Sequence, residues 1–159
     1  MEILDKEPVR RVERIISKFN SKLRVIVLNT TAKTANEAAD SLKCDVGAIV
    51  KSLLFRAEES FLICLVAGDK RCSLNKLKKI LKKKDVSMAN ADEVKQNTGF
   101  SIGGVSPVAH IKKLDVLIDK SLKRFENVFA AAGHPNCVFK ISYNDLVKMT
   151  NGSEKNVSE

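Results

Sequence analysis

The sequence contains few of the residues that build metal or redox centres. It has four cysteines, two histidines and no CxxC pair. Cys64 and Cys137 lie within apolar runs typical of strands, so we interpret the cysteines as reduced, mostly buried residues and not as disulfide partners or zinc ligands. We therefore expect no bound metal and no cofactor.

Long apolar runs are also missing. None approaches the roughly 18–20 apolar residues that cross a bilayer, and the first seven residues, MEILDKE, lack the apolar stretch of a secretory signal. We expect a cytoplasmic protein that makes no contact with a membrane. The 159 residues show no internal repeat and no linker, and this length is typical of one ordinary domain.

The familiar sets of catalytic side chains are absent too. The sequence shows no Ser-His-Asp set, no cysteine placed to act with a histidine, and no pair of carboxylates in loop positions. Any catalysis would then have to depend on main-chain groups or on an isolated charge.

Glycine and proline are rare, and they gather in one place. Residues 99–107, GFSIGGVSP, hold three of the seven glycines and one of the three prolines. Glycine permits positive φ and close approach of the backbone, while Pro107 biases Ser106 toward extended geometry. The exposed amides of Gly103, Gly104, Val105 and Ser106 would form a cradle for an anion or oxyanion, although an ordinary turn is the alternative.

A single lysine interrupts an apolar strand-like run upstream. In residues 45–55, alternation places Lys51 on the same face as Leu53 and Phe55, with Ser52 on the other. Lys51 could extend to solvent or pair with an acid such as Asp45. Alternatively it is a cation at the wall of a pocket, where it would meet an anionic or carbonyl oxygen.

Positive charge exceeds negative charge, with 28 Lys and Arg against 19 Asp and Glu. Residues 73–84 place apolar side chains on one helical stripe and lysines, including Lys76, Lys79 and Lys83, on the other side. Together with Lys112 and Lys113 these lysines could bind the phosphates of a polyanion such as tRNA, although a merely solvated basic face is the alternative.

The periodicity predicts an α/β (α+β) fold with one curved, mixed sheet, a barrel-like core and helices outside. We expect one domain over residues 1–152, and a polar, frayed tail over 153–159. Helices are predicted from capping residues and apolar spacing over 8–20, 34–42, 73–84, 90–99 and 142–152. Strands are predicted over 22–28, 45–55, 60–67, 85–88, 116–119, 127–132 and 137–141.

Several segments, in order, resemble the YbaK/ProX family of trans-editing aminoacyl-tRNA deacylases, relatives of the editing domain of bacterial prolyl-tRNA synthetase. The resemblance covers about residues 30–152. The matching segments are Thr34-Ala35-Asn36-Glu37, Val50-Lys51-Ser52-Leu53, Val66-Ala67-Gly68-Asp69, Ala89-Asn90-Ala91-Asp92, Gly103-Gly104-Val105-Ser106-Pro107, Asp119-Lys120-Ser121-Leu122 and Ala131-Ala132-Gly133-His134-Pro135.

The resemblance implies hydrolysis, in trans, of the ester that joins a small mischarged amino acid to tRNA, with tRNA-Pro as the expected tRNA. Residues Gly103 to Pro107 would hold the aminoacyl carbonyl, Lys51 would be the most important side chain, and the terminal ribose of the tRNA would assist the attacking water. We also expect Ser52, Ile102 and His134 to line the substrate site. Ser52 departs from the threonine or asparagine that follows this lysine in known branches of the family, so the amino acid that is cleared stays open.

The partners implied are mischarged tRNA and prolyl-tRNA synthetase, with the protein a monomer or weak homodimer. The alternative is a module that binds the 3′ end of tRNA, or regulates a partner, without turnover. A third reading, hydrolysis of a small ester, would not require the tRNA body.

Overall fold

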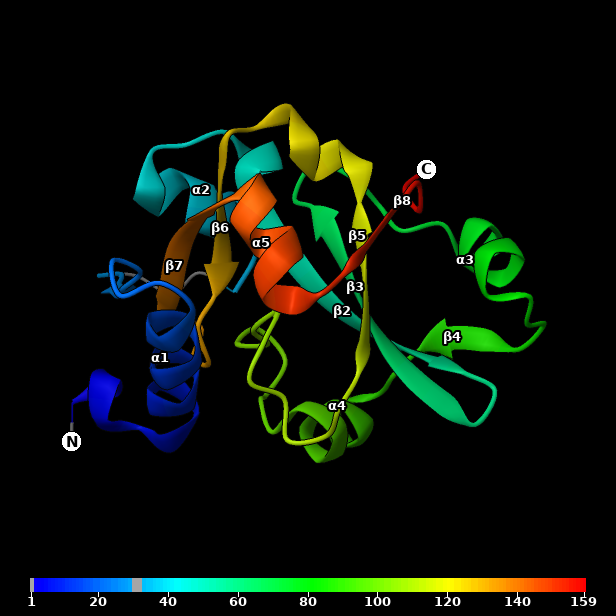
Figure 1. The fold of residues 1–159 in the computed structure, drawn as a ribbon, viewed down its shortest axis with the longest axis horizontal. Coiled ribbons are helices and arrows are strands. Elements are labelled where there is room, and N and C mark those ends of the chain that lie inside the picture. Colours follow the sequence, from blue (N-terminus) through cyan, green and yellow to red (C-terminus); the bar gives the residue numbers. More distant parts are fainter. Residues whose placement is uncertain (1, 30–32) are drawn as a thin grey trace.

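In a computed structural model of the chain, residues 2–29 and 33–159 are described, so the first three residues of the expected core, 30–32, lie outside the described residues. Among the described residues no helix has both the length and the apolar character needed to cross a membrane. The chain forms one α/β domain around a single mixed sheet (Figure 1).

The described helices and strands follow the predicted order closely. The α-helices are α1 (Glu7–Phe19), α2 (Ala35–Leu42), α3 (Leu74–Leu81), α4 (Ala91–Thr98) and α5 (Tyr143–Thr150). Short 3-10 segments are η1 (Ile3–Asp5), η2 (Val46–Ala48) and η3 (Lys120–Arg124). The strands are β1 (Val25–Val27), β2 (Ile49–Ala57), β3 (Ser60–Ala67), β4 (Val86–Met88), β5 (Asp115–Asp119), β6 (Asn127–Ala131), β7 (Cys137–Ser142) and β8 (Ser153–Lys155).

Local chemistry explains why the helices begin and end where they do. The side chains of Thr34, Ser73, Asn90 and Ser142 each accept a hydrogen bond from the third amide of the helix that follows. Such caps satisfy amides that have no partner inside the helix. Gly99 ends α4 in the left-handed region, at φ 79°, which glycine adopts without strain.

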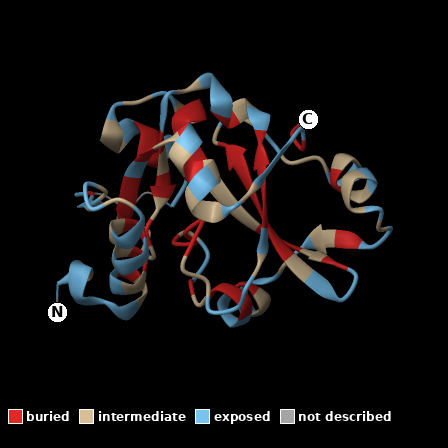
Figure 2. Ribbon diagram, viewed as in Figure 1, coloured by how far each residue is buried: buried red, intermediate tan, exposed pale blue. Residues whose placement is uncertain are grey.

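The sheet runs in the order β1-β7-β6-β2-β3-β5-β8, with β4 paired to β2 off this path. β2 is antiparallel to β3 and parallel to β6, and β3 is parallel to β5, so the sheet is mixed as predicted. Both faces of its centre are buried, as Figure 2 shows for the middle strands.

Alternation along β3 divides the core into two clusters. Ile63 and Leu65 pack with residues of α1, α4 and α5, whereas Cys64 and Val66 pack with Leu77 of α3 on the opposite face. Side chains of consecutive residues in a strand point to opposite faces, so a strand buried on both faces is continuously apolar.

The prediction of a frayed tail over 153–159 is wrong. Residues 153–155 form β8, parallel to β5, and the side chain of Val157 is fully buried. The carboxylate of Asp119, at the end of β5, accepts hydrogen bonds from the amides of Val157 (2.7 Å) and Ser158 (3.0 Å). The docking of this polar segment depends on main-chain pairing and on one distant carboxylate, neither of which is visible in its composition.

Candidate active site

One edge of β2 is open over a short stretch in the middle of the sheet. β3 pairs with β2 from Val50 to Ala57 on one side. On the other side β6 pairs with it only at Ile49 and Val50, and β4 only from Phe55 onward. A cavity of about 490 Å³ lies here, and it is lined by α2, β2, the β4–α4 segment, the loop of residues 99–107, β6 and β7. This volume is within the range of small-ligand sites.

Lys51 and the glycine-containing loop line this main cavity together. Of the loop, Ile102, Gly103 and Val105 reach the cavity, and Lys51 and Ser52 line it from β2. The fold therefore brings to one cavity two features that are about 50 residues apart in sequence. Because β2 lacks a neighbouring strand here, residues on both of its faces reach the cavity.

The Lys51 side chain lies on the face of β2 predicted from alternation. Its ammonium donates a hydrogen bond to the main-chain carbonyl of Lys70, in the turn after β3. Burial, and next the neighbouring Arg71, lower the pKa of Lys51, while Asp69 acts in the opposite direction. An ammonium has three donors, so two N–H groups of Lys51 are available to a ligand oxygen.

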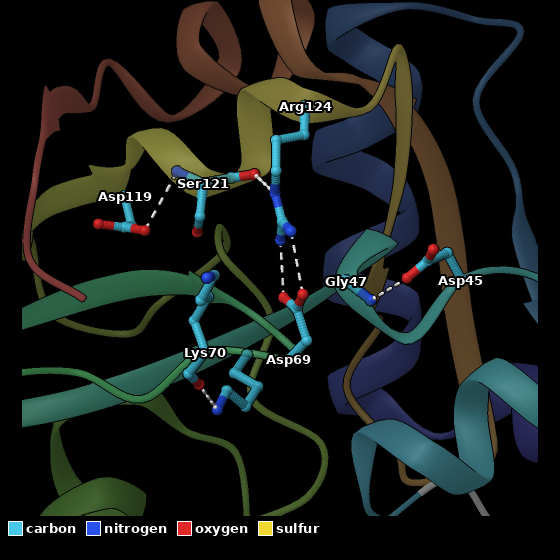
Figure 3. A network of polar contacts seen from close by, with 8 residues as sticks. Asp45, Gly47, Asp69, Lys70, Asp119, Ser121 and Arg124 are labelled. Atoms are coloured by element: carbon cyan, nitrogen blue, oxygen red, sulfur yellow. Dashed lines mark hydrogen bonds and ion pairs between the residues drawn. The ribbon is translucent and has the colours of Figure 1, made fainter. Parts of the chain in front are cut away.

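The turn that carries the Lys70 carbonyl is fixed by an ion pair. Both carboxylate oxygens of Asp69 accept from the guanidinium of Arg124, at 2.7 and 3.0 Å (Figure 3). The hydrogen bond with Arg124 lowers the pKa of Asp69. A bidentate pair of this kind restrains both partners in direction as well as in distance.

The loop of residues 99–107 is held by α1. The guanidinium of Arg11 lies 4.6 Å from the centre of the Phe100 ring, and its Nε donates to the carbonyl of Ala109 at 2.7 Å. Its Nη2 also donates to the carbonyl of Thr98, at 3.3 Å. One arginine thus anchors both ends of the loop.

The loop presents fewer free amides than the sequence suggests. Gly103 has φ 94°, and no acceptor among the described residues is paired with its amide or with that of Val105. The amide of Gly104 donates to the carbonyl of Ser101 at 3.0 Å, so the prediction that it faces a ligand is wrong. Ser106 and Pro107 are buried and line neither cavity described here.

The predicted substrate residues lie in two places. Ser52 and the exposed Ile102 line the main cavity. His134 instead lines a second cavity of about 200 Å³, on the other side of the loop, with Gly104, Lys6 and Lys95. Gly104 packs closely against the His134 segment, since a Cβ there would lie 2.9 Å from the amide nitrogen of His134. Burial and then Lys6 lower the pKa of His134.

The predicted tRNA-binding lysines are distributed over different elements. Lys76 and Lys79 are on α3 and Lys83 follows it, at the end of the molecule away from α1 and α2 (Figure 1). The ammonium of Lys76 donates to the carbonyl of Ser158, so it secures the tail. Lys112 and Lys113 are exposed and lie between α4 and β5. The main-chain amide of Lys112 donates to the carbonyl of Asn97, in α4.

Sequence reasoning missed one cation of the main cavity. Lys33 lines it, and its Cγ lies 3.9 Å from where a Cβ of Gly103 would be. Nothing in the local pattern distinguishes Lys33 from other surface lysines, because only the tertiary fold brings α2 against the loop. Among the described residues, no group of three or more His, Cys, Asp and Glu side chains could hold a metal ion.

Known proteins are similar to this chain in sequence and in fold. The chain is 39% identical over 95 residues to proline–tRNA ligase of Kosmotoga olearia. The aligned stretch covers 60% of this chain and 16% of that ligase. It is 32% identical over 139 residues to the uncharacterized protein YwhH of Bacillus subtilis, which covers 87% and 88% of the two chains. A solved structure, described as a candidate trans-editing enzyme for prolyl-tRNA synthetase, superposes with a TM-score of 0.91 at 33% identity, over 97% of this chain and 98% of that one.

The chain thus spans under one fifth of the Kosmotoga ligase and nearly the whole of the other two. Residues 29–149 match the model of the aminoacyl-tRNA editing domain family. This range includes the loop of residues 99–107, strand β2 with Lys51, and every residue that lines the main cavity. The chain belongs to the aminoacyl-tRNA editing domain family.

Proposed function

We propose that this protein hydrolyses, in trans, the ester that joins a small, wrongly attached amino acid to tRNA, with tRNA-Pro as the substrate and prolyl-tRNA synthetase as the enzyme whose errors it clears. The observation that carries the proposal is the convergence of Lys51, Gly103 and Val105 on one cavity. The likeness to proline–tRNA ligases and to a candidate trans-editing enzyme supports the choice of tRNA.

The proposed chemistry needs no protein nucleophile. Water attacks the ester carbonyl carbon, the carbonyl oxygen becomes an oxyanion, and the 3′ hydroxyl of the tRNA leaves. The free amides of Gly103 and Val105 would donate to the oxyanion, and the ammonium of Lys51, held by the Lys70 carbonyl, would place positive charge beside the reacting ester. Donors that are already oriented stabilise such charge without reorganising.

The residue pattern favours an enzyme over a module that only binds the 3′ end of tRNA. A cation fixed at the wall of a partly apolar cavity stabilises negative charge that develops during a reaction. Binding of phosphates alone would need only the exposed lysines, such as Lys112 and Lys113.

The test is release of free amino acid from a panel of mischarged tRNA-Pro species, measured for the wild type and for Lys51→Ala. Removal of one transition-state donor commonly costs about 10²–10³-fold in rate, and we expect a loss of that size. Lys140→Ala is the matched control, because Lys140 is an exposed lysine on a strand, β7, away from both cavities. Activity of Lys51→Ala within threefold of the wild type would exclude this role, and inactivity of the wild type on every species would favour the binding module.

A further inference from the structure

The side chain of Ser52 has a polar group without a partner in the main cavity wall. Its Oγ is shielded from solvent, and no described residue forms a hydrogen bond with it. Ser52 also lies in the open stretch of β2, between the last residue paired with β6 and the first paired with β4. Ser52 is therefore an incompletely bonded residue of this wall.

The main-chain groups of Ser52 point into the gap between β6 and β4. In an antiparallel pair, N–H and C=O groups of successive residues point to alternate edges of the strand. The carbonyl of Ile49 accepts from Gly68, on the β3 side, whereas the carbonyl of Leu54 accepts from Ala89, on the opposite side. The main-chain N–H and C=O groups of the even-numbered residues of β2 therefore point away from β3. Ser52 is one of these residues.

No strand among the described residues bonds to these main-chain groups. The pairing with β6 ends at Val50, and that with β4 begins at Phe55. Among the described residues none donates to the Ser52 carbonyl or accepts from its amide across the gap. A polar group left unpaired when a site closes costs about 1–3 kcal/mol, so a ligand that enters the gap is expected to bond to the main-chain amide and carbonyl of Ser52.

The two main-chain groups match one functional group in particular. An uncharged primary amine has N–H donors and a lone pair, which complement the carbonyl and the amide of Ser52. A charged ammonium would face Lys33 and Lys51, while no Asp or Glu belongs to the described lining of the cavity. An α-amino group has a pKa near 7.7–8.0 even when unperturbed, so its neutral form is accessible at physiological pH.

We propose that Ser52 binds the α-amino group of the aminoacyl ester in its uncharged form, and that the enzyme thereby accepts esters of free amino acids and rejects N-acylated ones. This inference rests on the function proposed above. Its consequence is selectivity between two classes of RNA ester, because peptidyl-tRNA carries the same ester bond but an acylated nitrogen. An amide nitrogen has one N–H and no available lone pair, and its acyl group would have to enter the gap.

Binding can be measured without turnover. The probes are 3′-amino-3′-deoxyadenosine carrying alanyl, isobutyryl or N-acetylalanyl groups in amide linkage, which the enzyme's ester hydrolysis does not consume. The isobutyryl compound replaces the amine by a methyl group of similar size, so it removes the hydrogen bonds without adding bulk. We expect the alanyl compound to bind at least tenfold more tightly than either analogue in calorimetry, and to shift the amide resonance of Ser52 in NMR spectra.

Equal affinity of the alanyl and isobutyryl compounds, or no measurable binding of the alanyl compound, would overturn the assignment of Ser52. The same selectivity is expected in turnover, where alanyl-tRNA-Pro should be hydrolysed and N-acetylalanyl-tRNA-Pro spared, each relative to its uncatalysed rate. Equal acceleration of both would refute the role of the amine while leaving the proposed deacylase function intact. Failure to hydrolyse any mischarged tRNA would refute that function, and the binding comparison would still decide the role of Ser52.

Discussion

Replacement of Asp119 by alanine tests how the C-terminal segment is held. One carboxylate oxygen accepts from the amides of Val157 and Ser158, and the other accepts from Ser121 at 3.1 Å. Asp119 is 1% exposed and Val157 is fully buried, so Asp119→Ala would leave two buried amides without an acceptor or force the tail away from β5.

The two outcomes cost similar amounts of free energy. Unpaired buried amides cost about 1–3 kcal/mol each, and exposing the Val157 side chain costs about 1.5–3 kcal/mol. The protein would adopt the cheaper outcome, so we expect the free energy of unfolding to fall by about 3 kcal/mol. For a chain of this size that corresponds to a Tm lower by about 6–12 °C.

Urea and thermal unfolding measure this loss, with Asp115→Ala as the control. Asp115 lies on the same strand and is exposed, so its replacement should change the free energy of unfolding by less than about 0.5 kcal/mol. If Asp119→Ala is as stable as Asp115→Ala, the carboxylate does not hold the tail.

The pH dependence gives an independent check on Asp119. Burial on its own would raise the pKa of this carboxyl, but the hydrogen bonds from Ser121, Val157 and Ser158 outweigh burial and lower it. A carboxyl whose pKa is lower in the folded state stabilises the fold above its unfolded pKa, about 3.9, and loses that contribution as pH falls through the folded value. The difference in stability between wild type and Asp119→Ala should therefore be full at pH 7 and shrink below about pH 4. A difference that is unchanged at pH 3 would contradict a charged carboxylate at this position.

Three further substitutions test two glycines and a helix cap by thermal unfolding. Gly133→Ala should destabilise strongly, because Gly133 has φ 91° and a Cβ would lie 2.7 Å from the carbonyl oxygen of Pro8. Gly103→Ala has a similar φ, 94°, but its nearest heavy atom would be at 3.7 Å, so only backbone strain of about 1–2 kcal/mol is expected; equal losses at the two positions would contradict the steric argument. Asn90→Ala removes the hydrogen bond that the Glu93 amide donates to the Asn90 side chain in a capping box, and should cost about 1 kcal/mol; no loss would show that this bond contributes nothing.

The regular elements were predictable because their signals are local. Ser73, Asn90 and Ser142 cap the helices that they precede, and residues 57–60 form the hairpin turn that joins two predicted strands, β2 and β3. Each signal acts within three or four residues, so the order of the elements can be derived from the amino-acid sequence without knowledge of tertiary contacts. The first strand was predicted too long, over 22–28, because only residues 25–27 pair with β7.

The candidate site was predictable in part. Lys51 and Gly103 were singled out because a cation in an apolar run and a cluster of glycines are unusual wherever they occur, and both line the main cavity. Lys33, the second cavity around His134 and the use of the Gly104 amide inside the loop carry no local signal. They depend on which elements pack against each other.

The sequence by itself determined the helices, most of the strands, the mixed α/β class and the two unusual segments, because these depend on capping, periodicity and backbone freedom. Only the tertiary structure decided that β6 and β4 leave Ser52 unpaired between them, and that Asp119 draws the polar tail against β5. A gap in a sheet and a buried carboxylate arise from contacts between residues far apart in the chain. Such contacts are set by packing and hydrogen bonding in three dimensions, so no local pattern of residues encodes them.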